Sequence, residues 1–346
     1  MERIIKIGTR GSRLALWQAE WIKSRLEEYR KDIKVKLVRI KTTGDKILDV
    51  PLSRVGGKGL FVKEIEEGLL KDTIDLAVHS MKDLPTELPA GLYIGAITER
   101  EDPRDALIIK VQSSKFKVKS FKDLPKDAVV GTSSLRRQSQ LKAIRPDLNI
   151  INLRGNLDTR IRKLVEGKFD AIVVASAGVR RLGLGDRITE YLPPEVSLPA
   201  IGQGALGIEI RMNDKFTGEL VGFLNHEETS LCVKAERAFL KRLEGGCQVP
   251  IAAYARIRSQ ESSVFSHQSK KISEKNNYGR RTEDNGLIVM DGLVGSVSGD
   301  RIVRGHIEGK TWESETIGVK LAEDLLSRGG REILNEIYGK SESLKV

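Results

Sequence analysis

The stretch DAIVVAS at residues 170–176 decides the fold, because it repeats the shape of DLAVHS at residues 75–80. Each is a short apolar run that opens on aspartate, ends at serine and follows a helical pattern with glycine or lysine near its end. A second pair lies upstream of these two runs: GT at 8–9 and GT at 131–132 each end a predicted strand and open a helix. The sequence therefore predicts two related α/β units.

Ligands of open α/β sheets bind beyond the carboxyl ends of the strands. Two such units facing one another would form a cleft between them, with the loops after both sets of strands on its walls. Short α/β segments also resemble one another by chance, so the duplication stays open at this point.

The N-terminal helix is predicted from Ser12, a suitable N-cap, followed by Leu14, Trp17, Trp21 and Ile22 at helical spacing. We expect these four side chains to form its apolar face. Residues 199–205 read as a hinge or a return crossing between the units.

The C-terminal third predicts a smaller α+β domain. A helix over 231–243 stops at Gly245. Strands follow at 249–257, 286–295 and 301–309, and a helix over 319–338 is interrupted by paired glycines at 329–330.

Composition bounds the possibilities. The chain has 346 residues, a net charge of +11 and two cysteines, which suggests two or three domains in a reducing compartment. No apolar run approaches the ~20 residues of a membrane span, and the N-terminus has no secretory pattern. The segment 256–281 holds seven Lys and Arg residues against two glutamates and reads as a solvated insertion.

Arginines gather at the predicted strand ends or at the helix starts beyond them. Guanidinium groups bind carboxylates bidentately and stay charged, and helix N-termini add affinity for anions. One such pair alone is commonly a solvated surface feature, but four groups at ligand-facing loops favour a polyanion site. The groups are Arg10 and Arg13; Arg136 and Arg137; Arg154, Arg160 and Arg162; and Arg180 and Arg181.

Two residues could carry chemistry within such a site. Asp83, after Lys82 and a buried strand, is placed to accept N–H hydrogen bonds or to stabilise a cation. The alternative is an ordinary turn or cap aspartate. Cys247, on a loop freed by two glycines, would let a thiol reach an electrophile in a neighbouring cleft, although a lone loop cysteine is more often inert.

The glycine-rich GGKG at 56–59 is not a Walker A loop and reads as a mobile lid with a basic tip, or as a plain flexible loop. The four histidines are scattered and the cysteines are unpaired, so we expect no metal site.

Seven strings together resemble the porphobilinogen deaminase (hydroxymethylbilane synthase) family, and they span nearly the whole chain in order. They are GTRGS at 8–12, LALWQ at 14–18, GGKGLF at 56–61, VHSMKDLP at 78–85, GTSSLRRQ at 131–138, LRGN at 153–156 and EGGCQVP at 244–250.

The resemblance implies an α/β fold of two lobes like those of periplasmic binding proteins, with a central cleft, plus a small α+β C-terminal domain. It implies domain 1 at 1–98 and 201–222, domain 2 at 104–198, and domain 3 at 227–346. The family usually passes quickly between the strands after the cysteine. Here a polar, basic insertion of about residues 259–285 intervenes, and we expect it to be a disordered segment or a hairpin.

The resemblance also implies roles for individual residues. Cys247 matches the residue that carries a dipyrromethane cofactor through a thioether, and Asp83 matches the catalytic carboxylate. The other residues matched to cofactor contacts are Lys82, Asp83, Thr132, Ser134, Arg136 and Arg137. Those matched to substrate contacts are Arg10, Ser12, Lys58 on the lid, Arg154, Arg160 and Arg181.

The implied reaction joins four porphobilinogens head to tail, releases ammonia each time and ends by hydrolysis to hydroxymethylbilane. The two cysteines and the absence of a signal peptide point to a cytoplasmic protein, and the family resemblance suggests a monomer. We expect no nucleic-acid or membrane partner. Two other readings of the sequence are kept: a basic nucleic-acid-binding protein, which lacks aromatic platforms near its basic runs, and a non-catalytic, two-lobed anion-binding protein.

Overall fold

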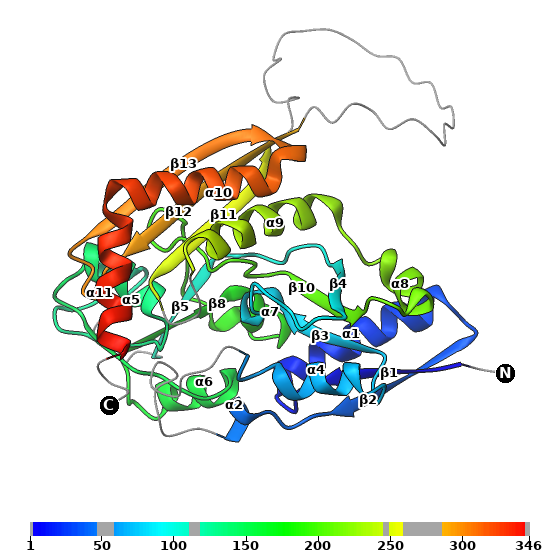
Figure 1. Cartoon of the computed structure of the whole chain (residues 1–346). Coiled ribbons are helices and arrows are strands. Elements are labelled where there is room, and N and C mark those ends of the chain that lie inside the picture. Colours follow the sequence, from blue (N-terminus) through cyan, green and yellow to red (C-terminus); the bar gives the residue numbers. More distant parts are fainter. Residues whose placement is uncertain (1–2, 47–58, 111–117, 245–248, 259–285, 343–346) are drawn as a thin grey trace, which may run out of the picture.

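A computed structural model describes residues 3–46, 59–110, 118–244, 249–258 and 286–342. The described chain forms three sheets with helices packed on them (Figure 1). Two sheets of five strands build two α/β lobes, and a three-stranded sheet builds a separate C-terminal unit. The α/β class with two lobes and a small C-terminal domain is therefore confirmed.

Lobe 1 is the sheet with strand order β2-β1-β3-β10-β4 and the helices that cover it. β1 is parallel to β2 and β3, whereas β10 is antiparallel to β3 and β4. The strands are β1 (Arg3–Thr9), β2 (Ile33–Arg39), β3 (Leu76–Ser80), β4 (Leu92–Ile97) and β10 (Leu206–Arg211). The helices are α1 (Arg13–Tyr29), α2 (Thr43–Lys46), α4 (Lys63–Leu70) and α8 (Lys215–Gly222).

Lobe 2 repeats this topology, with strand order β7-β6-β8-β5-β9. β6 is parallel to β7 and β8, and β5 is antiparallel to β8 and β9. Its strands are β5 (Asp105–Ile109), β6 (Val129–Gly131), β7 (Asn149–Ile151), β8 (Ala171–Ala175) and β9 (Glu190–Leu192). Its helices are α5 (Leu135–Ile144), α6 (Leu157–Val165) and α7 (Ser176–Arg181). The chain crosses between lobes after β4 and returns before β10, so the predicted pair of related units is confirmed.

The C-terminal unit is an antiparallel sheet of β11 (Ile251–Arg258), β12 (Leu287–Gly295) and β13 (Ile302–Lys310). α9 (Glu227–Arg242) and α10 (Ser314–Leu325) pack on it through a buried core that includes Phe239, Met290 and Leu321. A π turn at Leu326–Gly330 then leads into α11 (Arg331–Glu342), where Gly329 has a φ of +103°. The predicted glycine interruption is confirmed.

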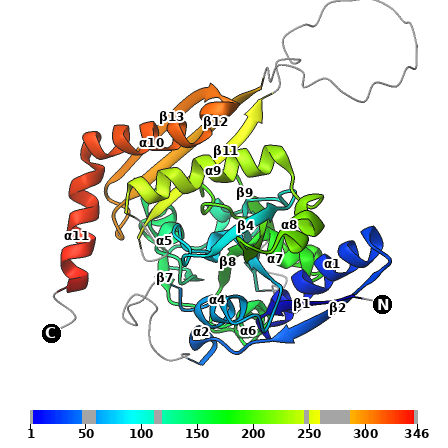
Figure 2. The ribbon, with the colours of Figure 1, turned by 45° about the vertical axis from the view of Figure 1, so that its right-hand side comes forward.

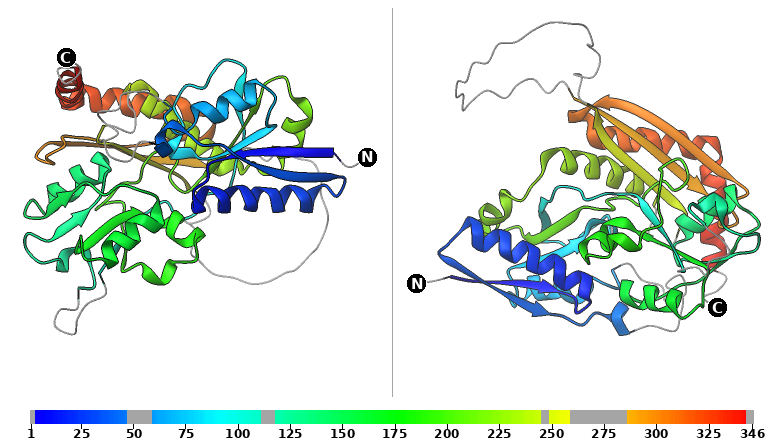
Figure 3. Two further views of the ribbon diagram at one scale, coloured as in Figure 1. Left: turned by 90° about the horizontal axis from the view of Figure 1, so that it is seen from below. Right: turned by 180° about the vertical axis from the view of Figure 1, so that it is seen from behind.

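Figure 2 shows α9 between the three-stranded sheet and the lobes. The left view of Figure 3 shows the two lobes as separate groups of elements, lobe 1 with its blue N-terminal strands and helix and lobe 2 in green. The helix that precedes Cys247 in the sequence thus lies on the boundary between the lobes and the C-terminal unit.

The N-terminal helix begins as predicted, because the Ser12 side chain accepts a hydrogen bond from the Ala15 N–H. Its predicted apolar face is wrong in part. Ile22 is buried, but Trp17 and Trp21 are each 37% exposed. The buried face is instead Gln18, Ala19, Ile22 and Leu26. The tryptophans did not identify the core face, because Ala19, Ile22 and Leu26 pack in the core of lobe 1 instead.

Candidate active site

The loops that follow four parallel strands carry most of the predicted site residues. β1 leads to Arg10 and Ser12, and β3 leads to Lys82 and Asp83. In lobe 2, β6 leads to the start of α5, and β8 leads to α7, which ends at Arg181. This is the edge at which the sheet topology places ligands.

A cavity of about 70 Å³ opens beside Asp83 in lobe 1. The Arg10 guanidinium lies over the Phe61 ring, 4.3 Å from its centroid, and both residues line the cavity. Ser12, Gln18, His79 and Ser80 add polar groups to the wall. The site therefore combines an aromatic face with hydrogen-bonding groups.

Asp83 ends a 3₁₀ turn, Met81–Asp83, that follows β3 directly. Met81 is buried, and its N–H donates to the Ala205 carbonyl at 3.0 Å. Gly202 packs against this turn with a φ of +67°, and a Cβ there would lie 2.7 Å from the Met81 Cβ. The turn is thus held rigidly, while the Asp83 carboxylate is exposed and forms no hydrogen bond or ion pair with another described residue.

Lys82 lies in the same turn. Its Nζ donates to the Gln203 Oε1 at 3.4 Å. Burial lowers the pKa of Lys82 to about 8, although the charge of Asp83 opposes the shift. The positive charges of Arg137 and Arg136 lower the pKa further, so this lysine of lobe 1 shares its surroundings with the arginines of lobe 2.

Asp105, the first residue of β5, joins these arginines. Its carboxylate is fully buried and accepts hydrogen bonds from Arg136 at 2.7 and 3.2 Å and from Arg137 at 2.8 Å. Ser197 and Gln203 donate to it at 2.7 and 2.9 Å. Burial alone would raise the pKa of Asp105, but the two guanidinium groups overcome this effect and hold the pKa far below its usual range.

Arg136 and Arg137 are each 5% exposed, so much of their hydrogen-bonding capacity is used inside lobe 2. Arg136 also donates to the Leu198 carbonyl, and Arg137 to the Val173 carbonyl. The Nε of Arg137 is nevertheless buried with no hydrogen-bond partner among the described residues. A buried donor without a partner is costly, and a bound anion would relieve that cost.

Ser134 and Thr132 organise the start of α5. The Ser134 hydroxyl caps the helix by accepting from the Arg137 N–H at 3.4 Å. The Thr132 hydroxyl accepts from the Ser134 N–H at 3.2 Å. These contacts fix the helix N-terminus and with it the direction of the two arginine side chains.

A second pair of arginines comes from the loop after β7 and from α6. Arg154 has a buried Nη1 with no hydrogen-bond partner in the described part of the chain. Arg160 donates from Nε to the Gly155 carbonyl at 2.8 Å. Burial lowers the pKa of Arg160 to about 10, and the charges of Arg137 and Arg154 act in the same direction, against Asp83. Arg160 therefore belongs to a cluster of cations that faces the Asp83 carboxylate.

Arg181 lies on α7 and reaches lobe 1. Its Nη2 donates to the Gly204 carbonyl at 2.6 Å, and its guanidinium lies 6.0 Å from the Trp17 ring centroid. Burial lowers its pKa to about 10, with the charge of Glu101 opposing. A second contact joins the lobes where Arg13 pairs with Asp158 at 3.2 Å. Arg162 and Arg180, predicted with the arginine groups, instead pair with Glu166 and Glu101 and are largely exposed. Lys58, Cys247 and the insertion at 259–285 lie outside the described residues.

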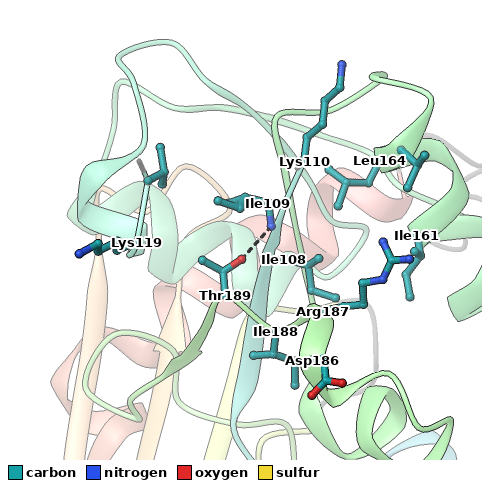
Figure 4. A pocket seen from close by; sticks show the side chains of 12 residues that line it. Ile108, Ile109, Lys110, Lys119, Ile161, Leu164, Asp186, Arg187, Ile188 and Thr189 are labelled. Atoms are coloured by element: carbon teal, nitrogen blue, oxygen red, sulfur yellow. Dashed lines mark hydrogen bonds between the residues drawn. The ribbon is translucent and has the colours of Figure 1, made fainter. Parts of the chain in front are cut away.

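A larger cavity of about 440 Å³ lies elsewhere on lobe 2, against β5 and α6 (Figure 4). Ile108, Ile161, Leu164 and Ile188 line it, with Lys110, Lys119, Asp186 and Arg187 also around it. None of the predicted site residues lines this cavity. The larger cavity therefore lies apart from the residues that the sequence singled out, whereas the smaller cavity is lined by Arg10, Ser12 and Asp83 among them.

Over the described ranges, no group of three or more His, Cys, Asp or Glu side chains is arranged to hold a metal ion. Among the helices that the structure describes, none combines the length and the apolar character needed to cross a membrane.

Sequence reasoning missed Asp105, the carboxylate on which Arg136 and Arg137 converge. A signal was present, since an aspartate that opens the apolar run DALII at 105–109 is unusual unless it is paired. Glu209 in the run IEI at 208–210 carries the same signal.

Residues 5–219 match the protein family described as "Porphobilinogen deaminase, dipyromethane cofactor binding domain", and residues 230–327 match "Porphobilinogen deaminase, C-terminal domain". A relative from Geobacter sulfurreducens named "Porphobilinogen deaminase" is 51% identical over 339 residues, covering 98% of this chain and 96% of its own. One of the same name from Pelobacter propionicus is 52% identical over 336 residues, covering 97% and 98%.

Among solved structures, the chain is similar to a TRAP periplasmic solute binding protein from Desulfovibrio salexigens, with 12% identity and a TM-score of 0.40, covering 66% of this chain and 74% of that one. The two-lobed fold itself follows from the strand orders of the two large sheets.

Proposed function

Since this chain belongs to the porphobilinogen deaminase family, we propose that it condenses four porphobilinogen molecules head to tail, releasing ammonia, to give hydroxymethylbilane. It is then a transferase of tetrapyrrole biosynthesis. The two other readings, a nucleic-acid-binding protein and a non-catalytic anion-binding protein, gain no support from its relatives.

One observation carries the proposal. The exposed Asp83 carboxylate, without a side-chain partner in the described chain, lies at a cavity that Arg10 also lines and acts on Arg160 from the other lobe. A lone carboxylate among cations suits a substrate with acidic arms and a pyrrole N–H that seeks an acceptor. We assign Asp83 the role of accepting the pyrrole N–H and stabilising the positive charge that develops as ammonia leaves.

The residues present fit the dipyrromethane cofactor of the family. Arg137 Nε and Arg154 Nη1 are buried donors without hydrogen-bond partners in the described chain, and cofactor carboxylates would satisfy them. Bound cofactor supplies a primer to which the substrate rings are added. Lys82, Thr132, Ser134, Arg136 and Arg137 would hold or orient it, and the thioether to Cys247 is part of the proposal.

The substrate side of the proposal assigns carboxylate binding to the remaining polar groups of the cleft. Six pyrrole rings with two acidic arms each give about twelve anions, which a dense array of guanidinium groups can neutralise. The assigned residues are Arg10, Ser12, Lys58, Arg154, Arg160 and Arg181. We also propose the domain limits 1–98 with 201–222, 104–198 and 227–346, a monomeric state and a cytoplasmic location.

Intact-protein mass tests the proposal directly. The purified protein should be heavier than its sequence by one covalent dipyrromethane, and Cys247→Ser should have the mass of its sequence alone. Cys232→Ser is the matched control, because burial raises the pKa of the Cys232 thiol to about 12 and leaves it unreactive. Active protein without an adduct on Cys247, or with one on Cys232, would contradict the assignment.

A further inference from the structure

Three buried titratable side chains lie together behind the cavity of lobe 1, and the reaction outlined above uses none of them. They are Glu66 on α4, His79 on β3 and Glu209 on β10, with exposed fractions of 7%, 6% and 0%. His79 itself lines the cavity together with Asp83. The group thus connects the interior of lobe 1 with the surface that meets substrate.

The sheet register explains how the three meet. Gly207 lies opposite His79 in the antiparallel pair of β10 and β3, so Glu209 falls on the same face, diagonal to His79. The Nε2 of His79 lies 2.9 Å from the Oε2 of Glu209. α4 packs on both strands and brings Glu66 to them.

Two carboxyl oxygens in this group have no hydrogen-bond partner among the described residues: Oε1 of Glu66 and Oε1 of Glu209. A buried, ionised carboxylate without a partner is costly, and a proton turns one of these acceptors into a donor. Burial, and after it the charge of Glu209, raise the pKa of Glu66 to about 7, with His79 opposing. The group therefore exchanges a proton near neutral pH.

Besides one another, the three residues have these charged neighbours in the described chain: Arg237 on α9 and, around the cavity that His79 lines, Arg10 and Asp83. Glu209 and His79 act on Glu66, and Arg237 from α9 interacts with Glu209. The Arg237 guanidinium also donates to the Pro85 carbonyl at 2.6 Å and keeps its charge across this pH range. The change of charge near neutral pH therefore comes from the buried group, and not from its neighbour on α9.

We propose that Glu66, His79 and Glu209 form a proton store behind the wall of the cavity, which His79 reaches, and that its charge sets how tightly the cavity binds the carboxylates of porphobilinogen. The inference rests on the proposed function. When the store loses its proton, a negative charge appears in the poorly solvated interior next to the cavity and repels the acidic arms of the substrate. Substrate affinity should therefore fall as the pH rises through neutrality, whereas the chemistry at Asp83 is unchanged.

The test compares the pH dependence of KM and kcat in three proteins, each purified with its dipyrromethane attached. In the wild type, KM for porphobilinogen should rise about fivefold from pH 6 to pH 8. Glu66→Gln, a neutral isostere, should keep KM within about twofold. Glu67→Gln is the matched control on the same helix, since Glu67 pairs with Lys71 at the surface, and it should behave as the wild type. Equal slopes of KM in Glu66→Gln and wild type would overturn the proposal.

A second readout is independent of activity. The infrared band of a protonated carboxyl group should disappear through neutral pH in wild type and Glu67→Gln, and should be absent from Glu66→Gln. If Glu66→Gln shows the same titrating band, the proton is not stored at this group. If the wild type shows the band but its KM does not change with pH, the stored proton does not control substrate binding. Wild-type protein that releases no ammonia from porphobilinogen would instead refute the proposed function.

Discussion

At the scale of single residues, the site depends on carboxylates in opposite surroundings. Asp83 is exposed and forms no hydrogen bond or ion pair within the described chain, whereas Asp105 is fully buried and held by two arginines. The first is available to a ligand, and the second fixes the cations that surround the ligand. Each role therefore depends on the surroundings of the carboxylate: Asp83 must be accessible, and Asp105 must be buried beside the arginines.

Lengthening the Asp83 side chain tests its position. Asp83→Glu keeps the charge but moves it by one methylene, so contacts to a pyrrole N–H are lost and turnover should fall about 100-fold. Cofactor attachment should persist, so the intact mass should differ from that of the wild type only by the substitution. The surface change Asp32→Glu serves as the control. Wild-type rates in Asp83→Glu would refute the role assigned to Asp83.

Neutralising Asp105 tests whether its buried carboxylate holds Arg136 and Arg137 in place. Asp105→Asn leaves Arg136 and Arg137 without their counter-charge and should lower the free energy of unfolding by about 3 kcal/mol in urea titrations. Since folding depresses the pKa of Asp105, its stabilisation is present above the unfolded pKa of about 4 and is lost as the pH falls further. Asp102 pairs with Arg104 in a partly exposed position, so Asp102→Asn should lower the free energy of unfolding much less. An equal loss of unfolding free energy in both variants would contradict the stabilising role assigned to Asp105.

At the scale of elements, α9 couples the three parts of the molecule. Glu236 on this helix is fully buried and pairs with Arg100 at 2.8 and 2.9 Å, beyond the end of β4. It also accepts from the Gly202 N–H in the return crossing at 2.6 Å and from the Ala255 N–H of β11 at 2.8 Å. One carboxylate thus ties both crossings between the lobes to the C-terminal unit.

Glu236→Gln should release this coupling. The amide has one acceptor oxygen, and its N–H groups face the Arg100 guanidinium, so the contacts cannot all be kept. We expect a loss of about 3 kcal/mol and faster hydrogen exchange at the Gly202 and Ala255 amides. Glu228→Gln, exposed on the same helix, is the control, and its cost should stay below about 1 kcal/mol. Unchanged exchange at both amides would argue against the coupling.

At the scale of the whole molecule, the net charge of +11 favours an anionic substrate. Part of this attraction acts through solvent and is screened by salt. Raising NaCl from 50 to 300 mM should increase KM for porphobilinogen about threefold and leave kcat nearly unchanged. A neutral osmolyte of equal osmolarity provides the control. A KM that is independent of salt would show that only short-range contacts hold the substrate.

The local features were predictable because each depends on residues that are neighbours in the sequence. The GT strand ends, the Ser12 cap, the glycine interruption at 329–330 and the strands around the Lys82-Asp83 turn all follow from spacing and turn chemistry. The exposed tryptophans of α1 were predicted wrongly, since the sequence does not say which face of a helix meets a sheet.

The sequence by itself determined two α/β units, a C-terminal α+β unit and a set of arginines at strand ends, because periodicity and strand-end chemistry are local. Only the tertiary structure decided what those charges meet. His79 and Glu209 are 130 residues apart, and Arg100 and Glu236 are 136 apart. Such partners come together only when strands from distant parts of the chain pair in one sheet and a helix packs over both crossings, and burial then sets which carboxyl groups stay charged.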